Sequence, residues 1–206
     1  RSTLFPYTTL FRSGRRVARA ATLETSGTRG SRKRLFFTDE DLEDTKGFFA
    51  AGMAHIPGSR TLIAMSGERP GSVGALLAEA LGRIGRVGFA EGPVSDPSVV
   101  LGRIAALNAD SLVGVPAEML ALARTPGAGL VGPLRSVLLS GDIASRPLVA
   151  AVEAAFGCPV FRHYGMAETG YGAAVECARH EGMHIREADL LMEVVDGAPP
   201  DRKSVV

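Results

Sequence analysis

Short apolar runs alternate along this chain with longer segments in which apolar residues recur at helical spacing. The apolar runs predict strands at 61–65, 86–90, 111–115, 134–140 and 159–161. The amphipathic segments predict helices at 38–54, 75–84, 96–107, 116–124 and 147–156. Because strands with continuous apolar character are buried on both faces, the pattern predicts an α/β fold, with a mostly parallel sheet and helices on both faces.

The first predicted helix has the clearest beginning. Thr38 supplies an N-cap hydroxyl, and the acidic residues after it suit the positive end of a helix dipole. One flank of this helix is apolar, through Leu42, Phe48, Phe49 and Met53. At the far end of the chain, segment 188–196 is rich in strand-forming residues, and we expect it to begin a different, more peripheral layer.

The glycine-rich turn at 67–74 lies between a predicted strand and a predicted helix, which is where a dinucleotide-binding loop would be. Its irregular glycine spacing, its Pro70 and the lack of an acidic residue about 20 positions later argue against that function. The segment is better explained as a tight turn with helix-capping residues.

The two ends of the chain differ in character from the rest. Segments 1–13 and 201–206 match conceptual translations of a sequencing adapter in its two orientations, and we expect both to be artefacts. Together they hold four of the 23 Lys and Arg residues but one of the 22 Asp and Glu residues, so segment 14–200 has a slight acidic excess in place of the formal +1 charge. Its overall charge therefore does not predict binding to nucleic acid.

No apolar run approaches the roughly 18 residues that cross a membrane as a helix, so no membrane association is expected. The two cysteines, Cys158 and Cys177, do not make a disulfide framework. A reduced, cytoplasmic setting is the simplest expectation.

Segment 25–34 concentrates small, hydroxyl-bearing and basic residues just before the first helix. Glycines let backbone N–H groups approach phosphate oxygens, hydroxyls add hydrogen bonds, and Lys or Arg neutralises charge. The candidate phosphate-binding residues are Thr25, Ser26, Gly27, Thr28, Gly30 and Lys33. The same composition also suits a solvated loop, and the spacing is not that of a P-loop, so the residues alone leave both interpretations open.

Segment 163–170, His-Tyr-Gly-Met-Ala-Glu-Thr-Gly, is the second candidate site. Tyr164 offers an aromatic face for stacking, Gly165 gives the backbone freedom, and the Glu168 carboxylate suits a hard cation such as Mg²⁺. An ordinary aromatic-glycine turn with a surface glutamate has the same composition.

Together, the two segments resemble motifs of the adenylate-forming, or AMP-binding, superfamily, which includes acyl-coenzyme A ligases, luciferases and peptide-synthetase adenylation domains. Segment 25–33 resembles its Thr-Ser-Gly-Thr-Thr-Gly-x-Pro-Lys signature, and 164–168 resembles its Tyr-Gly-x-Thr-Glu motif. Their order and their separation by more than a hundred residues also match. Segment 14–200 is therefore identified as part of the large N-terminal domain of such an enzyme, and we expect the small C-terminal lid domain, with its catalytic Lys, to lie outside this chain.

The resemblance implies an ATP-dependent acid-thiol ligase. Such an enzyme joins a carboxylic acid to AMP, releases pyrophosphate, and passes the acyl group to coenzyme A. The implied ligands are therefore ATP or AMP, Mg²⁺, coenzyme A and a carboxylic acid. Lys33 and Glu168 are the implied catalytic residues: the loop holds the β- and γ-phosphates, its cations offset charge on the departing pyrophosphate, and Glu168 ligates Mg²⁺.

The resemblance also implies a nucleotide site. Tyr164 would stack on adenine and Gly165 would let the backbone come close. The family's small glycine-containing turn, which lines the adenine and acyl sites, corresponds to Ser140, Gly141 and Asp142 at the end of a predicted strand, where ligands bind in open α/β sheets. His163 completes the implied nucleotide-binding set. Asp142 or Ser145 capping the following helix is an equal alternative for this turn.

Three residues depart from the family motifs. Arg29 replaces the second Thr of the central Thr-Thr pair in the loop signature, Arg32 replaces its Pro, and Ala167 replaces the Thr that touches the α-phosphate. Ala167 removes one hydrogen bond, worth about 1 kcal/mol. These departures keep a second hypothesis open, that of a catalytically inactive nucleotide-binding module of the same fold. A kinase-like phosphotransferase is disfavoured by the missing P-loop spacing.

Segment 176–196 looks most like phenylacetate-coenzyme A ligase and its relatives, which implies an aryl acid as one candidate substrate. Cys177, His180 and His184 have spacings that would begin a zinc site, which some of those relatives complete with a later Cys-x-Cys. The alternative is a buried cysteine with solvated histidines.

Overall fold

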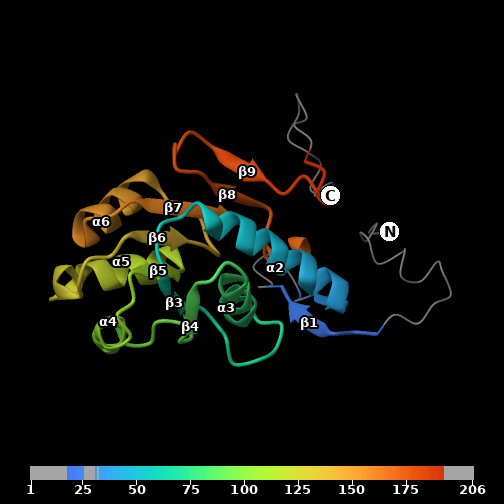
Figure 1. Cartoon of the computed structure of the whole chain (residues 1–206), viewed down its shortest axis with the longest axis horizontal. Coiled ribbons are helices and arrows are strands. Elements are labelled where there is room, and N and C mark those ends of the chain that lie inside the picture. Colours follow the sequence, from blue (N-terminus) through green and yellow to red (C-terminus); the bar gives the residue numbers. More distant parts are fainter. Residues whose placement is uncertain (1–17, 26–30, 32, 193–206) are drawn as a thin grey trace.

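The computed structural model describes residues 18–25, 31 and 33–192. Seven strands form one sheet in the order β4-β3-β5-β6-β7-β8-β9 (Figure 1). The strands are β3 (Arg60–Ala64), β4 (Val87–Ala90), β5 (Ser111–Gly114), β6 (Ser136–Leu139), β7 (Val160–Tyr164), β8 (Ala174–Glu176) and β9 (Met183–Ile185). Pairing is parallel from β4 to β7, which confirms the predicted α/β class with a mostly parallel sheet.

Helices cover both faces of this sheet, as predicted (Figure 1). They are α2 (Asp39–Ala54), α3 (Val73–Arg83), α4 (Pro97–Ala106), α5 (Pro116–Arg124) and α6 (Arg146–Phe156), with short 3-10 helices η1 (Ala128–Leu130) and η2 (Ala167–Thr169). Within the described ranges, no helix is long and apolar enough to cross a membrane.

Alternate residues of each central strand enter two different apolar cores. On β5, Leu112 packs in the core beneath α4, α5 and α6, whereas Val113 packs in the core beneath α2 and α3. Leu139 and Leu138 divide in the same way on β6. Because successive side chains of a strand point to opposite faces, burial of both faces explains why these strands are apolar at nearly every position.

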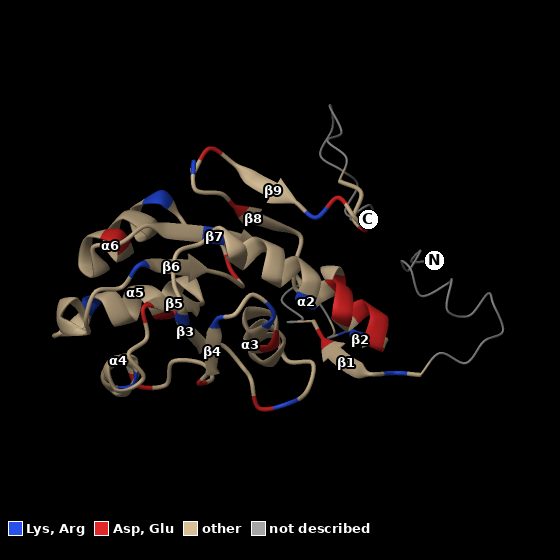
Figure 2. Cartoon of the chain, viewed as in Figure 1, with Lys and Arg blue, Asp and Glu red and all other residues tan. Residues whose placement is uncertain are grey.

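Helix α2 begins where the sequence predicts. The Thr38 hydroxyl oxygen accepts a hydrogen bond from the Asp41 backbone nitrogen at 3.1 Å, and the Asp41 carboxylate accepts one from the Thr38 backbone nitrogen at 2.8 Å. This reciprocal capping box satisfies two N–H groups that a helix start leaves without partners. Figure 2 shows acidic residues gathered at this end of α2.

The carboxyl-terminal part of the sheet differs from the prediction. Strands β8 and β9 extend the sheet in antiparallel fashion, and the sequence pattern does not indicate them as strands. Segment 188–196 is expected to be β-prone, but its described part, 188–192, is not a strand. The Leu190 backbone nitrogen donates to the Arg186 carbonyl at 3.1 Å, so the chain turns there, and the prediction of a strand is wrong for these residues.

A separate two-stranded antiparallel hairpin precedes α2, formed by β1 (Ala21–Glu24) and β2 (Arg34–Phe37). Leu23, Leu35 and Phe37 form a small core with Ala167 and Tyr171, which belong to a turn more than a hundred residues later. The hairpin is thereby held against the segment that follows β7.

Candidate active site

A cleft of about 420 Å³ opens beside the carboxyl ends of β6 and β7. Both predicted turns line it, because neighbouring parallel strands end at the same edge of the sheet. Its lining residues are Leu139, Gly141, Asp142, Ile143, Ala144, Arg162, His163, Tyr164, Gly165, Met166 and Met183. The structure therefore brings the 140–142 turn and the 163–166 turn together, as the sequence implies.

Tyr164 and Gly165 shape one wall of the cleft. Tyr164 is 46% exposed, so its aromatic side chain is accessible at the cleft that it lines. Gly165 lies so close to the chain after it that a Cβ atom would stand 2.0 Å from the Tyr171 carbonyl oxygen. Only glycine fits at this position, because that oxygen belongs to backbone and cannot swing aside.

Gly141 and Asp142 also line the cleft, and both are exposed just after β6. The Asp142 carboxylate accepts a hydrogen bond from the Ile143 backbone nitrogen at 2.7 Å. Ser145 is the N-cap residue of α6, but its side chain makes no capping hydrogen bond. Neither Asp142 nor Ser145 therefore caps α6 with its side chain, which the alternative interpretation of this turn as a helix cap requires.

Three hydrogen bonds hold the turn that carries Glu168: one lies within the turn, and two come from other parts of the chain. The Thr45 hydroxyl of α2 donates to the Gly170 carbonyl at 3.0 Å, and the Met166 backbone nitrogen donates to the Thr169 hydroxyl at 3.2 Å. The buried Arg186 guanidinium donates to the Thr169 carbonyl at 3.3 Å and is paired with Asp189. Glu168 itself is exposed, on η2, two residues beyond the lining of the cleft.

The candidate phosphate loop is the connection between β1 and β2. The Thr25 backbone nitrogen donates to the Lys33 carbonyl at 3.0 Å, and the Lys33 backbone nitrogen donates to the Thr25 hydroxyl at 3.0 Å. These bonds tie the two ends of the loop together, on the hairpin that packs against the turn after β7. The predicted phosphate-binding residues Ser26, Gly27, Thr28 and Gly30, and the departures Arg29 and Arg32, lie outside the described residues.

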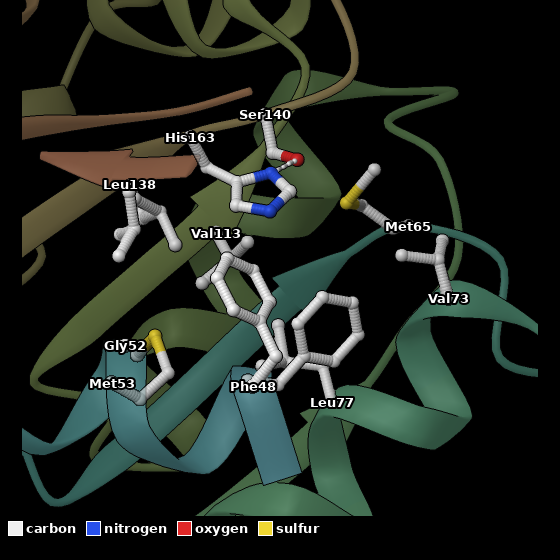
Figure 3. Close-up of a pocket in the computed structure, with 12 residues that line it drawn as sticks. Phe48, Gly52, Met53, Met65, Val73, Leu77, Val113, Leu138, Ser140 and His163 are labelled. Atoms are coloured by element: carbon white, nitrogen blue, oxygen red, sulfur yellow. Dashed lines mark hydrogen bonds between the residues drawn. The ribbon is translucent and has the colours of Figure 1, made fainter. Parts of the chain in front are cut away.

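Behind the cleft, an almost entirely apolar cavity of about 20 Å³ lies between the sheet and helices α2 and α3 (Figure 3). Ser140 and His163 stand at its edge, and His163 lines both the cavity and the cleft. The Ser140 hydroxyl and His163 Nδ1 are 2.9 Å apart. The other lining residues are Phe48, Phe49, Gly52, Met53, Met65, Val73, Leu77, Val113, Leu138 and Val175.

His163 and Ser140 are expected among the nucleotide-binding residues; His163 lines both the cleft and the apolar cavity, whereas Ser140 lines the cavity. Figure 3 shows the His163 ring between Ser140 on one side and Phe48 on the other. His163 Nε2 is buried and has no hydrogen-bond partner among the described residues. Burial lowers the pKa of His163 to about 4, so its imidazole is neutral at pH 7.

Arg162, which lines the cleft, forms an ion pair with Glu176. Arg162 donates from Nε and Nη2 to the two carboxylate oxygens of Glu176, at 3.1 and 2.6 Å. Burial alone would raise the pKa of Glu176, but the hydrogen bonds and charge of Arg162 outweigh burial and hold that pKa below its ordinary value. The pair ties β7 to β8, which places the chain after the Tyr164 turn.

The possible zinc ligands do not gather into a site within the described part of the chain. His180 Nδ1 lies 3.7 Å from Glu176 Oε1 and its ring packs over Phe161, while His184 faces His55 with ring centroids 6.3 Å apart. Cys158 is buried in the core with α6, and burial raises the pKa of its thiol to about 11. No group of three or more His, Cys, Asp or Glu residues that could hold a metal occurs in 18–25, 31 and 33–192.

Several residues that shape the site are missed by sequence reasoning. The pattern identifies Phe48 as apolar helix flank, but not as a wall of the cavity, and it does not identify Arg186 as the support of the Glu168 turn. The ion pair between Arg162 and Glu176 is also missed. None of these has a local signal, because each acts through a partner far along the chain or on another strand.

The chain matches the family described as AMP-binding enzyme over residues 25–194. No curated protein matches it. Among solved structures it is similar to 2-hydroxyisobutyryl-CoA ligase in complex with 2-HIB-AMP and CoA, with a TM-score of 0.68 and 18% identity over 80% of this chain and 37% of that one. It is also similar to an anthranilate CoA ligase in complex with anthranoyl-AMP, with a TM-score of 0.61 and 16% identity over 76% and 31%.

A third similar structure is the O-succinylbenzoate coenzyme A synthetase of Bacillus subtilis in complex with ATP and magnesium, with a TM-score of 0.57 and 24% identity over 80% of this chain and 34% of that one. At these identities the likeness is one of fold. The chain spans less than half the length of these relatives. The match over 25–194 and the shared fold confirm the resemblance carried by the two motifs: the chain belongs to the AMP-binding enzyme family.

Proposed function

We propose that this chain is the nucleotide-binding part of an ATP-dependent ligase that activates a carboxylic acid as its acyl-adenylate and transfers the acyl group to coenzyme A. The observation that carries the proposal is the placement of the Tyr164 turn, which borders a cleft and packs on one side against the hairpin whose strands flank the candidate phosphate loop. The Tyr164 and Asp142 turns line a single cleft, and the hairpin that carries the candidate phosphate loop packs against the segment after Tyr164.

The cleft suits an adenine nucleotide. An exposed Tyr164 provides the stacking surface, and Gly165 lets the chain after it pack close enough to hold the Tyr164 turn in place. Thr25 and Lys33 flank the loop proposed to hold the β- and γ-phosphates, where Lys33 is exposed and able to offset their charge.

The exposed carboxylate of Glu168 fits a hard cation, and it is the residue proposed to hold Mg²⁺. When bound, Mg²⁺ would neutralise charge on the phosphates. The described residues do not fit zinc, because the Cys and His side chains named above do not converge.

The proposed reaction has two steps that share this site. A carboxylate oxygen of the acid attacks the α-phosphorus of ATP; the bond from that phosphorus to the bridging oxygen breaks, and pyrophosphate leaves. The thiolate sulfur of coenzyme A then attacks the acyl carbon, and AMP leaves with the bonding electrons. Activation is needed because AMP is a far better leaving group than oxide.

The apolar cavity is the proposed seat of the acid. It adjoins the nucleotide cleft through His163, which lines both, so this proposal puts the acid next to the nucleotide. Its phenylalanine and aliphatic lining favours an apolar acid, including the aryl acids suggested by the resemblance to phenylacetate-coenzyme A ligase.

Pyrophosphate exchange on the full-length protein that contains this chain tests the proposal. With ATP, Mg²⁺ and a broad panel of carboxylic acids, we expect exchange with at least one acid. The departures Arg29 and Ala167 favour a second candidate, a nucleotide-binding module without catalysis. That module would bind AMP yet exchange pyrophosphate with no acid in the panel.

A further inference from the structure

The buried ring nitrogen of His163 is a polar atom of this site that the proposed reaction does not use. Nε2 is buried and has no hydrogen-bond partner among the described residues, and His163 is one of the residues that line the apolar cavity. A buried polar atom that leaves water without gaining a partner destabilises the folded state. Such an atom at the wall of a ligand cavity is well placed to pair with a polar group on the ligand.

The orientation of this nitrogen is fixed on both sides. Ser140 Oγ lies 2.9 Å from Nδ1 and holds the inner side of the ring. The rings of Phe48 and Phe49 contact the other side, with centroids 5.9 and 6.0 Å from the imidazole (Figure 3). Rotating the ring to give Nε2 another partner would break the bond to Ser140.

A lone water is a poor partner for Nε2. The cavity of about 20 Å³ has room for about one water, but buried waters are held by two to four polar groups. The polar side chains that line it are Ser140 and His163, so a water at Nε2 would have at most one further side-chain partner, the Ser140 hydroxyl that also bonds Nδ1. The partner of Nε2 is therefore better supplied by a polar group attached to an apolar body, which also fills the cavity.

The neutral imidazole restricts the chemistry of that group. One ring nitrogen donates and the other accepts, and the choice depends on whether Ser140 donates to Nδ1 or accepts from it. A hydroxyl matches either arrangement, because it donates and accepts. A charged substituent would meet no countercharge here, because burial keeps His163 in its neutral form.

We propose that the acid activated by this protein carries a hydroxyl on an apolar ring, and that His163 Nε2 hydrogen-bonds that hydroxyl within the cavity. This inference rests on the proposed function and adds a specificity-determining residue to it. A ring needs more space than the present cavity offers, since about 150 Å³ holds benzene. Phe48 and Met65 are half-buried lining side chains, and their displacement would widen the cavity.

The first test is binding to the chain itself, with matched pairs of acids. Chain labelled with ¹⁵N-histidine is titrated with phenylacetate against its ortho, meta and para hydroxyl derivatives, and with benzoate against the same three isomers. We expect at least one hydroxylated isomer to bind roughly tenfold tighter than its parent acid. The same isomer should shift the nitrogen resonance of one histidine, and that resonance should be missing in His163→Phe.

The second test is pyrophosphate exchange by the full-length protein with the same pairs. The preferred isomer should exceed its parent in kcat/KM by roughly tenfold, and His163→Phe should reduce this ratio to less than about threefold. His163→Gln retains a hydrogen-bonding group and should keep part of the preference. The matched control is His180→Phe, because His180 packs over Phe161 outside the cavity and should leave the ratio unchanged.

The outcomes separate this inference from the proposed function. If acids exchange pyrophosphate but hydroxylated and parent acids rank equally, the inference is overturned and the proposed function stands. If no acid exchanges, the proposed function fails and with it the claim that the acid is activated; the titration of the labelled chain then decides whether His163 binds a hydroxylated acid. Equal binding of every pair, or a shift confined to the resonance of a histidine other than His163, overturns it there.

Discussion

The two ends of the parallel strands differ in how their polar groups are satisfied. At the amino ends, the Asp110 carboxylate accepts hydrogen bonds from the backbone nitrogens of Ser59 and Arg60, each at 2.8 Å. The carboxyl ends instead border the cleft, the cavity and the buried Nε2 of His163. The sheet therefore has paired polar groups at the amino ends of its strands and a cleft at the carboxyl ends, which is where ligands bind in open α/β sheets.

At the amino ends, side-chain hydrogen bonds also connect residues of different strands and loops. The hydroxyls of Thr61 and Ser111 lie 2.8 Å apart in the interior, and the Ser136 hydroxyl donates to the Pro57 carbonyl. Buried polar groups that are fully paired hold a single arrangement. Substitutions at the amino ends should thus reduce stability, whereas most at the carboxyl ends should reduce binding.

Gly165→Ala should be the largest exception to this comparison. Gly165 lies at the carboxyl end of β7, where we expect most substitutions to affect binding, yet its replacement should destabilise the fold. A Cβ atom would stand 2.0 Å from the Tyr171 carbonyl oxygen, so backbone must shift. We expect the free energy of unfolding to fall by about 3 kcal/mol in chemical denaturation. Gly102→Ala in α4 is the matched control, since its Cβ would contact nothing within 4 Å and should be neutral or stabilising. Equal stability of the two variants would mean that the backbone at Tyr171 moves aside without cost.

Asp110→Ala tests the amino ends directly. It leaves the backbone nitrogens of Ser59 and Arg60 without their acceptor, and should lower the free energy of unfolding by about 2 kcal/mol. Affinity for AMP, measured by calorimetry below the unfolding transition, should stay unchanged. A loss of AMP affinity without a loss of stability would reverse the comparison between the two ends.

Lowering the pH tests how much the buried, neutral imidazole of His163 reduces the free energy of unfolding. The folded-state pKa of His163 is about 4, below the ordinary value of 6.5, so the unfolded chain takes up the proton first as pH falls. This group should therefore lower the free energy of unfolding by about 1.5 kcal/mol between pH 6.5 and pH 5, and contribute little change above that window. Denaturation of His163→Phe at the same pH values is the reference, and it should be less sensitive to pH by that amount. Identical pH profiles would show that the imidazole is not held neutral.

Asp142→Ala should have the smallest effect on stability and sharpen the contrast with Asp110. Its exposed carboxylate accepts from the adjacent Ile143 nitrogen, so the free energy of unfolding should change by less than about 0.5 kcal/mol. Because Asp142 lines the proposed nucleotide cleft, affinity for AMP should fall by roughly tenfold. Unchanged affinity would remove Asp142 from the proposed site.

Periodicity is sufficient to predict the parallel part of the sheet, because those strands are buried on both faces and read as continuous apolar runs. It does not reveal β8 and β9, which are three residues each, nor the β1–β2 hairpin around the polar loop. Motifs place Tyr164, Gly165 and Asp142 at one cleft. They do not reveal that the His163 ring lies against an apolar cavity, because that depends on Ser140 from a neighbouring strand and on Phe48 from α2.

The two cysteines differ in burial, so one of them can be labelled selectively. Cys158 is packed in the core, and its thiol has a pKa of about 11, so it reacts slowly with electrophiles at neutral pH. Cys177 is half-buried directly after β8, beside the strand whose Glu176 pairs with Arg162. A thiol-reactive fluorophore should therefore attach to Cys177 in the unmodified sequence and report from the β8 side of the cleft.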